Sequence, residues 1–333
     1  MQHFKSSFIV TAVGLILALY IGGISALYIV ALLAILEISL SFDNAVVNAK
    51  VLETMEPKWQ ERFITWGMIV AVFGMRFIFP IIIVAVASGL GIWETFKLAL
   101  DEPHAYHETL VSVEKLIFAF GGSFLLMVFL SFIFDTDREE KWISSIENSK
   151  LIEKMGRVSS SNMMISISIG LIVTSITSSY EIALAYFTGV LLYSLIASLD
   201  EFFNTNGVRS GIMGFLYLEV LDASFSFDGV IGAFALSSDI FIIMIGLGIG
   251  AMFVRSLTIY MLRNKTLTEY RYLEHGAHYA ILALAIIMLV KIFFHIDEVI
   301  VGTVGIAFIA LSAYHSIKAN KIPVTVKAEI THN

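Results

Sequence analysis

The same short pattern occurs twice in this chain, each time inside a long apolar stretch. The first copy is EISLSFDNAV, from Glu37 to Val46, and the second is DASFSFDGVI, from Asp222 to Ile231. Both copies read acid-x-Ser-x-Ser-Phe-Asp, so each places two carboxylates among apolar side chains. Ionisable groups are costly inside a membrane and usually mark functional positions there. The repeated pattern therefore predicts a polar site that two related halves of one chain build together.

The apolar stretches are too extensive for a water-soluble core. Of 333 residues, 58% are hydrophobic and only 15% are charged, and the mean hydropathy is +0.85. Crossing a membrane takes about 20 apolar residues. Ten stretches meet that need: 8–26, 28–50, 63–90, 112–134, 161–179, 181–199, 211–236, 240–262, 276–294 and 299–318. We predict an all-α polytopic membrane protein with about ten transmembrane helices. The first is expected to stay as a span rather than be cleaved as a signal peptide, because the second follows at once.

Charge predicts the orientation of these ten stretches. Most Lys and Arg residues fall in the predicted loops on the side of the two termini, so both termini are expected in the cytoplasm, with the chain in the cell's inner (plasma) membrane. The 91–111 loop is then external, and we interpret it as a solvated loop, with a cation-gathering vestibule as the alternative. Its acidic and histidine residues are Glu94, Asp101, Glu102, His104, His107 and Glu108. The net charge of −7 excludes a basic nucleic-acid-binding protein.

The spans that follow the two motif copies also match. Gly67 precedes Arg76 by nine residues, as Gly246 precedes Arg255. Each half holds five spans, and because five is odd, the second half would enter the membrane upside down. We expect two inverted five-helix repeats with a site near the midplane. The first is formed by 1–134 with 161–179 and the second by 181–320, with a cytoplasmic linker at 135–160 and a cytoplasmic tail at 321–333.

Acids outnumber arginines in these spans. The acids of the two motif spans are Glu37, Asp43, Glu219, Asp222 and Asp228, whereas the neighbouring spans hold only Arg76 and Arg255. Arginine pairing cannot neutralise the whole set, so the remaining acids must be protonated, reach water or bind a cation. The alternative is that acids and arginines only pair to hold the helices together.

Helical geometry limits how one cation could be held. Ser39 and Asp43 are neighbours one turn apart, as are Glu37 and Ser41. The second copy repeats this with Ser224 and Asp228, and with Asp222 and Ser226. Glu37 and Asp43 lie about 120° apart around an ideal helix. One cation reaches both only if the helix unwinds near the serines or the facing repeat supplies oxygens.

The available side chains favour a hard divalent cation. Asn44 adds an amide oxygen in one half, whereas Gly229 leaves space or flexibility in the other. Carboxylate, hydroxyl and amide oxygens suit manganese, magnesium or calcium. The chain has no cysteine, and the motif spans have no histidine, which argues against a dedicated zinc or copper site.

At these residues the sequence resembles the TerC family of membrane proteins, within the LysE transporter superfamily. The resemblance rests on EISLSFDNAV and LEVLDASFSFDGVI, each followed by an Arg-bearing span, and covers about residues 28 to 318. It implies a metal-ion exporter with manganese as the favoured ion. The ligands that it implies are Glu37, Asp43, Asp222 and Asp228. The residues expected to support them are Ser39, Ser41, Asn44, Glu219, Ser224, Ser226, Arg76 and Arg255.

Two other function classes stay open. One is an intramembrane hydrolase with Asp43 and Asp228 as an aspartyl dyad, although the chain lacks a Gly-x-Gly-Asp signature. The other is a membrane partner that supports the metallation of exported proteins. The transporter reading implies a protein that is no enzyme and holds no tightly bound cofactor. Its partners would be the lipid bilayer and divalent cations, with protons as a counter-ion and an oligomeric state left open.

Two further segments have less specific patterns. The run GLGIG, from Gly246 to Gly250, lies inside a predicted span without the strand of a nucleotide site, so we expect it to serve close helix packing. Glu274, His275 and His278 fall at the cytoplasmic start of a span. We expect them to reach toward the interface rather than to bind a metal.

Overall fold

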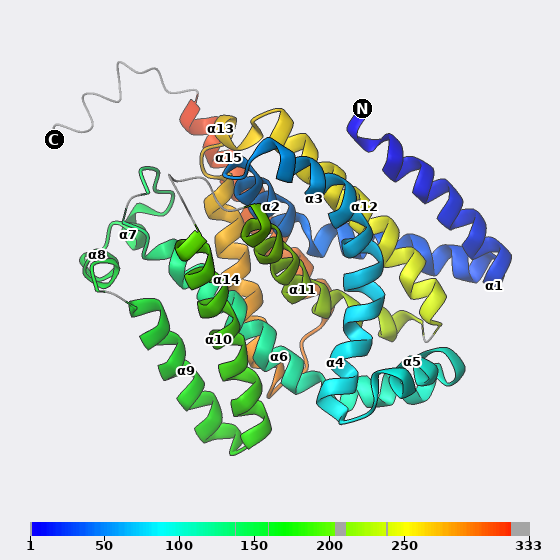
Figure 1. Cartoon of the computed structure of the whole chain (residues 1–333). Coiled ribbons are helices and arrows are strands. Elements are labelled where there is room, and N and C mark those ends of the chain that lie inside the picture. The colour runs from blue at the N-terminus through cyan, green and yellow to red at the C-terminus, as the bar shows by residue number, and fades with distance from the viewer. Residues whose placement is uncertain (1, 137, 159, 204–210, 238, 321–333) are drawn as a thin grey trace.

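The chain folds into helices throughout the part that the structure describes. The computed structural model (Figure 1) describes residues 2–136, 138–158, 160–203, 211–237 and 239–320. Every regular element within these ranges is helical and none is a strand, so the predicted all-α class is confirmed. The predicted tail at 321–333 lies outside the described residues.

Six helices of the described chain are long and apolar enough to cross a membrane. They are α1 (Lys5–Leu40), α6 (Pro103–Ile133), α10 (Tyr180–Phe203), α12 (Ile240–Arg263), α14 (Leu273–Lys291) and α15 (Glu298–Asn320). Two bent pairs raise the number to eight if each pair is one span: α4 (Phe79–Ser88) with α5 (Ile92–Asp101), and α8 (Lys150–Gly156) with α9 (Ser161–Thr177). The chain is thus a multi-pass membrane protein by length and composition, and the predicted ten separate spans are not confirmed.

The remaining elements are shorter or carry more charge. They are η1 (Gln2–Phe4), α2 (Phe42–Glu53), α3 (Pro57–Ile69), η2 (Val70–Ile78), α7 (Ser144–Glu147), α11 (Gly211–Leu236) and α13 (Thr266–Glu269). Helix α11 coincides with the predicted stretch 211–236 and carries three acids. The segment η2 is a π-helix between α3 and α4. Such segments are rare and occur frequently at functional sites.

The first two predicted spans are the two arms of α1, which is kinked at Gly22 and Gly23, and the chain folds back sharply there (Figure 1). The sequence predicts a very short turn between these spans, and this kink supplies it. Gly23 has φ 66° and ψ −154°, a conformation essentially restricted to glycine. The regular helix then ends at Leu40, and α2 begins after the single non-helical residue Ser41. The second motif shows no such break, because α11 runs through it continuously.

The prediction that residues 91–111 form a loop is wrong. These residues are folded as α5 and the first turns of α6, with Pro103 at the start of α6, a position that proline favours. The chain bends by 115° between α4 and α5. One face of α5 buries the small side chains of Thr95 and Ala99, which explains why a segment rich in charge is nevertheless helical.

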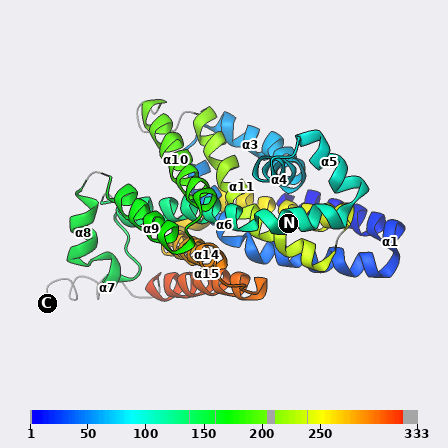
Figure 2. The ribbon, with the colours of Figure 1, turned by 90° about the horizontal axis from the view of Figure 1, so that it is seen from below.

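Helix α6 lies across the middle of the molecule, where it packs against α14 and α10 (Figures 1 and 2). Helix α12 packs along α1. A β-carbon at Gly246 would lie 2.5 Å from Leu33 Cβ, and one at Gly250 would lie 2.5 Å from Glu37 Cβ. These glycines let the two helices approach closely, so the packing role predicted for GLGIG is confirmed.

Candidate functional site

The two motif segments pack against each other in opposite directions. Three contacts pair them in order: Met55 with Gly214, Asn44 with Asp222, and Glu37 with Gly229. Residue numbers fall along the first segment as they rise along the second, so α11 runs antiparallel to α2 and the end of α1. The two copies of the pattern therefore meet in the interior.

Glu37 of α1 is buried and its charge is paired. Only 1% of the residue is exposed, and its carboxylate forms an ion pair with Arg76 of η2. The same carboxylate accepts a 2.8 Å hydrogen bond from Ser41 Oγ. The sequence predicts that Arg76 pairs with one of the motif acids, and that acid is Glu37. A β-carbon at Gly229 would lie 2.9 Å from Glu37 Oε2, so the second motif leaves room for this carboxylate.

Asp222 of α11 accepts hydrogen bonds from two side-chain amides in the other half of the chain. Its Oδ1 accepts hydrogen bonds from Asn44 Nδ2 at 2.7 Å and from Asn48 Nδ2 at 2.8 Å. Asn48 is not in the repeated pattern, and our sequence reasoning missed it. The available signal was its position four residues after Asn44, which places two amides on one face of a helix.

Arg255 of α12 faces the same region but makes a different bond from the one predicted. Its Nη2 donates to the backbone oxygen of Phe63, and its guanidinium carbon lies 3.9 Å from the centre of the Phe63 ring. Glu219 and Asp222 are close enough for their charges to act on Arg255. A β-carbon at Gly67 would collide with Arg255 Nη2 and lie 3.0 Å from Glu219 Oε1. The glycine of one half thus makes room for the arginine of the other.

These buried side chains are linked by hydrogen bonds, by an ion pair and by charges close enough to act on one another, and we call them the polar centre. It consists of Glu37, Ser41, Asn44, Asn48, Arg76, Glu219, Asp222 and Arg255. Several of its oxygen atoms accept no hydrogen bond, namely Asn44 Oδ1, Asn48 Oδ1, Glu219 Oε1 and Glu219 Oε2. The polar centre is therefore rich in unused buried acceptors.

The four acids expected as ligands are not all in this group. Asp43 is buried, and it lines a small cavity of about 10 Å³ with Ser39, Phe225 and Gly302, beside α14 and α15. The backbone of Asp228 lies in α11, but its side chain lies outside the described structure. Among the described residues, no three His, Asp or Glu side chains form a group able to hold a metal ion. Glu37 and Asp222 are thus the two expected ligands whose described side chains lie between the motif segments, each against the opposite copy.

The expected supporting serines have separate roles. Ser41 bonds to Glu37, as described, whereas Ser39 Oγ donates to the Ile35 carbonyl at 2.9 Å and Ser224 Oγ donates to the Val220 carbonyl at 3.0 Å. Ser226 is buried. Hydroxyls that bond back to their own helix in this way are common in apolar helices.

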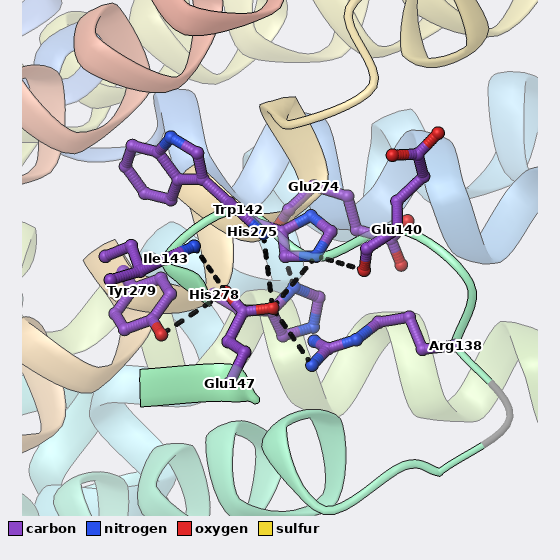
Figure 3. A network of polar contacts seen from close by, with 9 residues as sticks. All are labelled: Arg138, Glu140, Trp142, Ile143, Glu147, Glu274, His275, His278 and Tyr279. Atoms are coloured by element: carbon purple, nitrogen blue, oxygen red, sulfur yellow. Dashed lines mark hydrogen bonds and ion pairs between the residues drawn. The ribbon is translucent and has the colours of Figure 1, made fainter. Parts of the chain in front are cut away.

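A second polar network lies where the predicted linker meets α14 (Figure 3). Its hub is Glu147, which is only 1% exposed. The five donors around its carboxylate are Arg138 Nη2 at 3.3 Å, Trp142 N at 3.3 Å, Ile143 N at 3.2 Å, Tyr279 Oη at 3.3 Å and His275 Nε2 at 3.4 Å. Burial by itself raises the pKa of Glu147, but the bonds from His275 and the backbone, with the nearby Arg138 charge, hold this pKa below its ordinary value. The linker is thus folded around a buried carboxylate.

The expectation that His275 and His278 reach toward the interface is wrong. Both are buried, because the linker covers this end of α14. His275 Nε2 lies 2.9 Å from the Glu140 carbonyl oxygen, and the His278 ring stacks on Phe132 with 3.7 Å between centroids. Covering by the linker was not visible in the local sequence around the histidines.

The fold and the polar centre define the protein as a multi-pass α-helical membrane protein with acids and arginines buried between its helices. A family model described as a protein of unknown function, DUF475, matches residues 42–323. The match spans most of the chain, which belongs to this family. No curated protein and no solved structure matches the chain.

Proposed function

We propose that the protein is a membrane transporter that exports a divalent metal cation, with manganese as the favoured ion, through the polar centre. The observation that carries this proposal is that Glu37 and Asp222, the first acids of the two motif copies, are both buried and each lies against the opposite copy. Arg76 pairs with Glu37, so Glu37, Asp222 and Glu219 together have only the charges of Arg76 and Arg255 beside them in the polar centre. A bound cation would supply the missing positive charge, and the oxygen ligands suit a hard ion.

The contacts between the halves support inverted repeats. In the alignment of the two copies, Glu37 corresponds to Asp222 and Asn44 corresponds to Gly229. Asn44 of the first copy contacts Asp222 of the second. The equivalent residues in the opposite copies, Gly229 and Glu37, also lie against each other. Two-fold related halves would produce such reciprocal contacts, and the antiparallel packing of the motif segments agrees with them. Inverted-repeat transporters bind their substrate where the repeats meet.

Contacts at one end of the molecule support the proposed orientation. Lys50 near the end of α2 pairs with Glu274 at the start of α14, with 3.0 Å between Nζ and Oε2. Trp142 of the linker donates to His315 near the end of α15 at 2.8 Å. The charge pattern predicts a cytoplasmic location for all four segments, and they gather at the same end.

Transport by the purified protein tests the proposal and its two rivals. Reconstituted inside-out vesicles should take up manganese, with magnesium, calcium and zinc as competitors. Asp222→Asn should nearly abolish uptake while the protein stays folded, because the amide keeps the shape and removes the charge. Glu181→Gln, at an exposed site on α10, is the matched control. A wild-type protein that moves none of these ions alone would overturn the proposal and favour a metallation partner, and cleavage of a membrane substrate would favour the hydrolase.

A further inference from the structure

Four buried oxygen atoms in the polar centre lack a hydrogen-bond donor. They belong to Asn44, Asn48 and Glu219, which are 2%, 3% and 5% exposed. Buried acceptors are normally satisfied, and those left without a donor destabilise the fold. Asn44 Nδ2 and Asn48 Nδ2 each donate one hydrogen to Asp222 Oδ1, and neither donates its second hydrogen to Glu219. What these atoms share is the capacity to give electron pairs to a cation.

The antiparallel packing places Asn48 and Glu219 on the same level. Asn48 lies four residues after Asn44 along α2, and Glu219 lies three residues before Asp222 along α11. Because the two segments run in opposite directions, both steps lead one turn toward the same end of the molecule. The contact of Met55 with Gly214 further along fixes this register.

Arg255 and Arg76 are close enough for their charges to act on Glu219, but neither donates a hydrogen bond to it. Arg255 instead donates to the carbonyl oxygen of Phe63 and lies over the Phe63 ring. Arg76 is engaged by Glu37. Glu219 therefore keeps both oxygens available, unlike Glu37, whose carboxylate accepts from Arg76 and Ser41.

We propose that Asn48 and Glu219 form a binding subsite for a hard divalent cation, with the amide oxygen of Asn44 and the carboxylate of Asp222 beside it. This inference rests on the proposed transport function and deepens it, because it adds two residues outside the shared pattern. Oxygen ligands alone favour manganese, magnesium or calcium over ions that prefer nitrogen or sulfur. The subsite lies one turn from the motif contact toward the end that carries Lys50.

Direct binding of manganese to the purified full-length protein tests the subsite. The free ion is counted by electron paramagnetic resonance, with magnesium, calcium and zinc as competitors. Asn48→Leu and Glu219→Gln should each weaken binding at least about tenfold, whereas Asn264→Leu and Glu181→Gln at exposed sites should bind as the wild type does. An all-oxygen site lacks the nitrogen and sulfur ligands that zinc prefers. Magnesium and calcium should therefore compete with manganese more effectively, relative to zinc, than they do at nitrogen-containing sites.

A second variant keeps the test decisive if Asn48→Leu does not fold. Asn48→Asp cannot donate to Asp222, but it adds a carboxylate to the subsite, so it should bind manganese at least as tightly as the wild type. A weaker affinity in Asn48→Asp would mean that Asn48 only supports Asp222 and would overturn the subsite. Wild-type affinity in both Asn48→Leu and Glu219→Gln would also overturn it, while leaving the proposed transport intact. A wild-type protein that binds none of the ions would reject both proposals.

Discussion

Glu37 and Glu219 are both buried glutamates of the polar centre, yet their surroundings differ. Glu37 has a salt bridge and a hydroxyl donor, whereas neither oxygen of Glu219 has a hydrogen-bond partner. Removing one partner of a buried ion pair leaves the other charge uncompensated, which costs far more than the pair itself contributes. The same substitution therefore has different consequences at the two residues.

Arg76→Ala is expected to destabilise the protein by about 3–5 kcal/mol, because it leaves the Glu37 carboxylate buried without its counter-charge. Thermal unfolding in detergent measures this loss. Arg76→Lys should recover only part of it, since lysine restores the charge without the planar guanidinium. The double variant Glu37→Gln with Arg76→Leu removes both charges and should recover more than Arg76→Ala. Unchanged unfolding of Arg76→Ala would contradict the role of this pair.

Glu147 gives the linker a dependence on pH. Because its folded pKa lies below its ordinary value, the linker contacts are fully stabilised above the ordinary pKa of 4.5 and weaken as the pH falls through the lower, folded pKa. Proteolysis after Lys154 or Arg157 should therefore be slow at pH 7 and faster in acid. Glu147→Gln should speed cleavage at pH 7 and reduce the difference between the two conditions.

The control for this prediction is Glu153→Gln. Glu153 belongs to an exposed ion pair with Arg157, and exposed pairs contribute little. A Glu147→Gln variant that is cleaved no faster than this control would show that the buried carboxylate does not hold the linker.

At the scale of elements, the kink of α1 depends on one backbone conformation. A β-carbon at Gly23 would contact nothing within 4 Å, so a substitution there costs only the strain of its φ of 66°. Gly23→Ala should destabilise the protein by about 1–3 kcal/mol in thermal unfolding. Gly305 in α15 also has open space for a β-carbon, and no positive φ is found there. Gly305→Ala should therefore be neutral or slightly stabilising, and equal losses at both positions would refute the strain argument.

Most helices follow from the apolar stretches, but their joints do not. The predicted stretches 240–262 and 299–318 differ by at most two residues at either end from α12 and α15, because long apolar runs favour regular helices. The break at Ser41 lies inside the predicted stretch 28–50, and the apolar pattern does not mark it. The helix α5 was missed because its buried face consists of small residues rather than large apolar ones.

The candidate site was predictable to a similar extent. The acids and Arg76 were visible as rare charges in apolar segments, but the sequence did not indicate which acid Arg76 pairs with, and the structure shows that it is Glu37. Asn48 was not visible as a partner of Asp222, because their contact joins residues 174 positions apart in the chain. The hydrogen bond of Arg255 to Phe63 was missed for the same reason, since a backbone oxygen leaves no mark in the sequence.

At the scale of the whole molecule, the proposed orientation predicts which surfaces face the cytoplasm. The chain has no cysteine, so single cysteines introduce unique labels. Glu102→Cys and Ser145→Cys replace exposed residues at the α5–α6 junction and in the linker. An impermeant thiol reagent should label position 102 from outside intact cells and position 145 only after the membrane is opened. Labelling of both positions from the same side would reject the proposed topology.

The break at Ser41 separates α2 from α1 at a point beside Glu37. Lys50 lies nine residues beyond this break, which is about 13 Å along a helix. Tilting α2 by about 10° would carry Lys50 through roughly 2 Å, enough to pull its ammonium group out of reach of Glu274. Glu274 precedes His275, which contacts Glu147. A cation that tilted α2 by binding at Asn44 and Asn48 would therefore loosen a contact at the end of α14 that the linker covers.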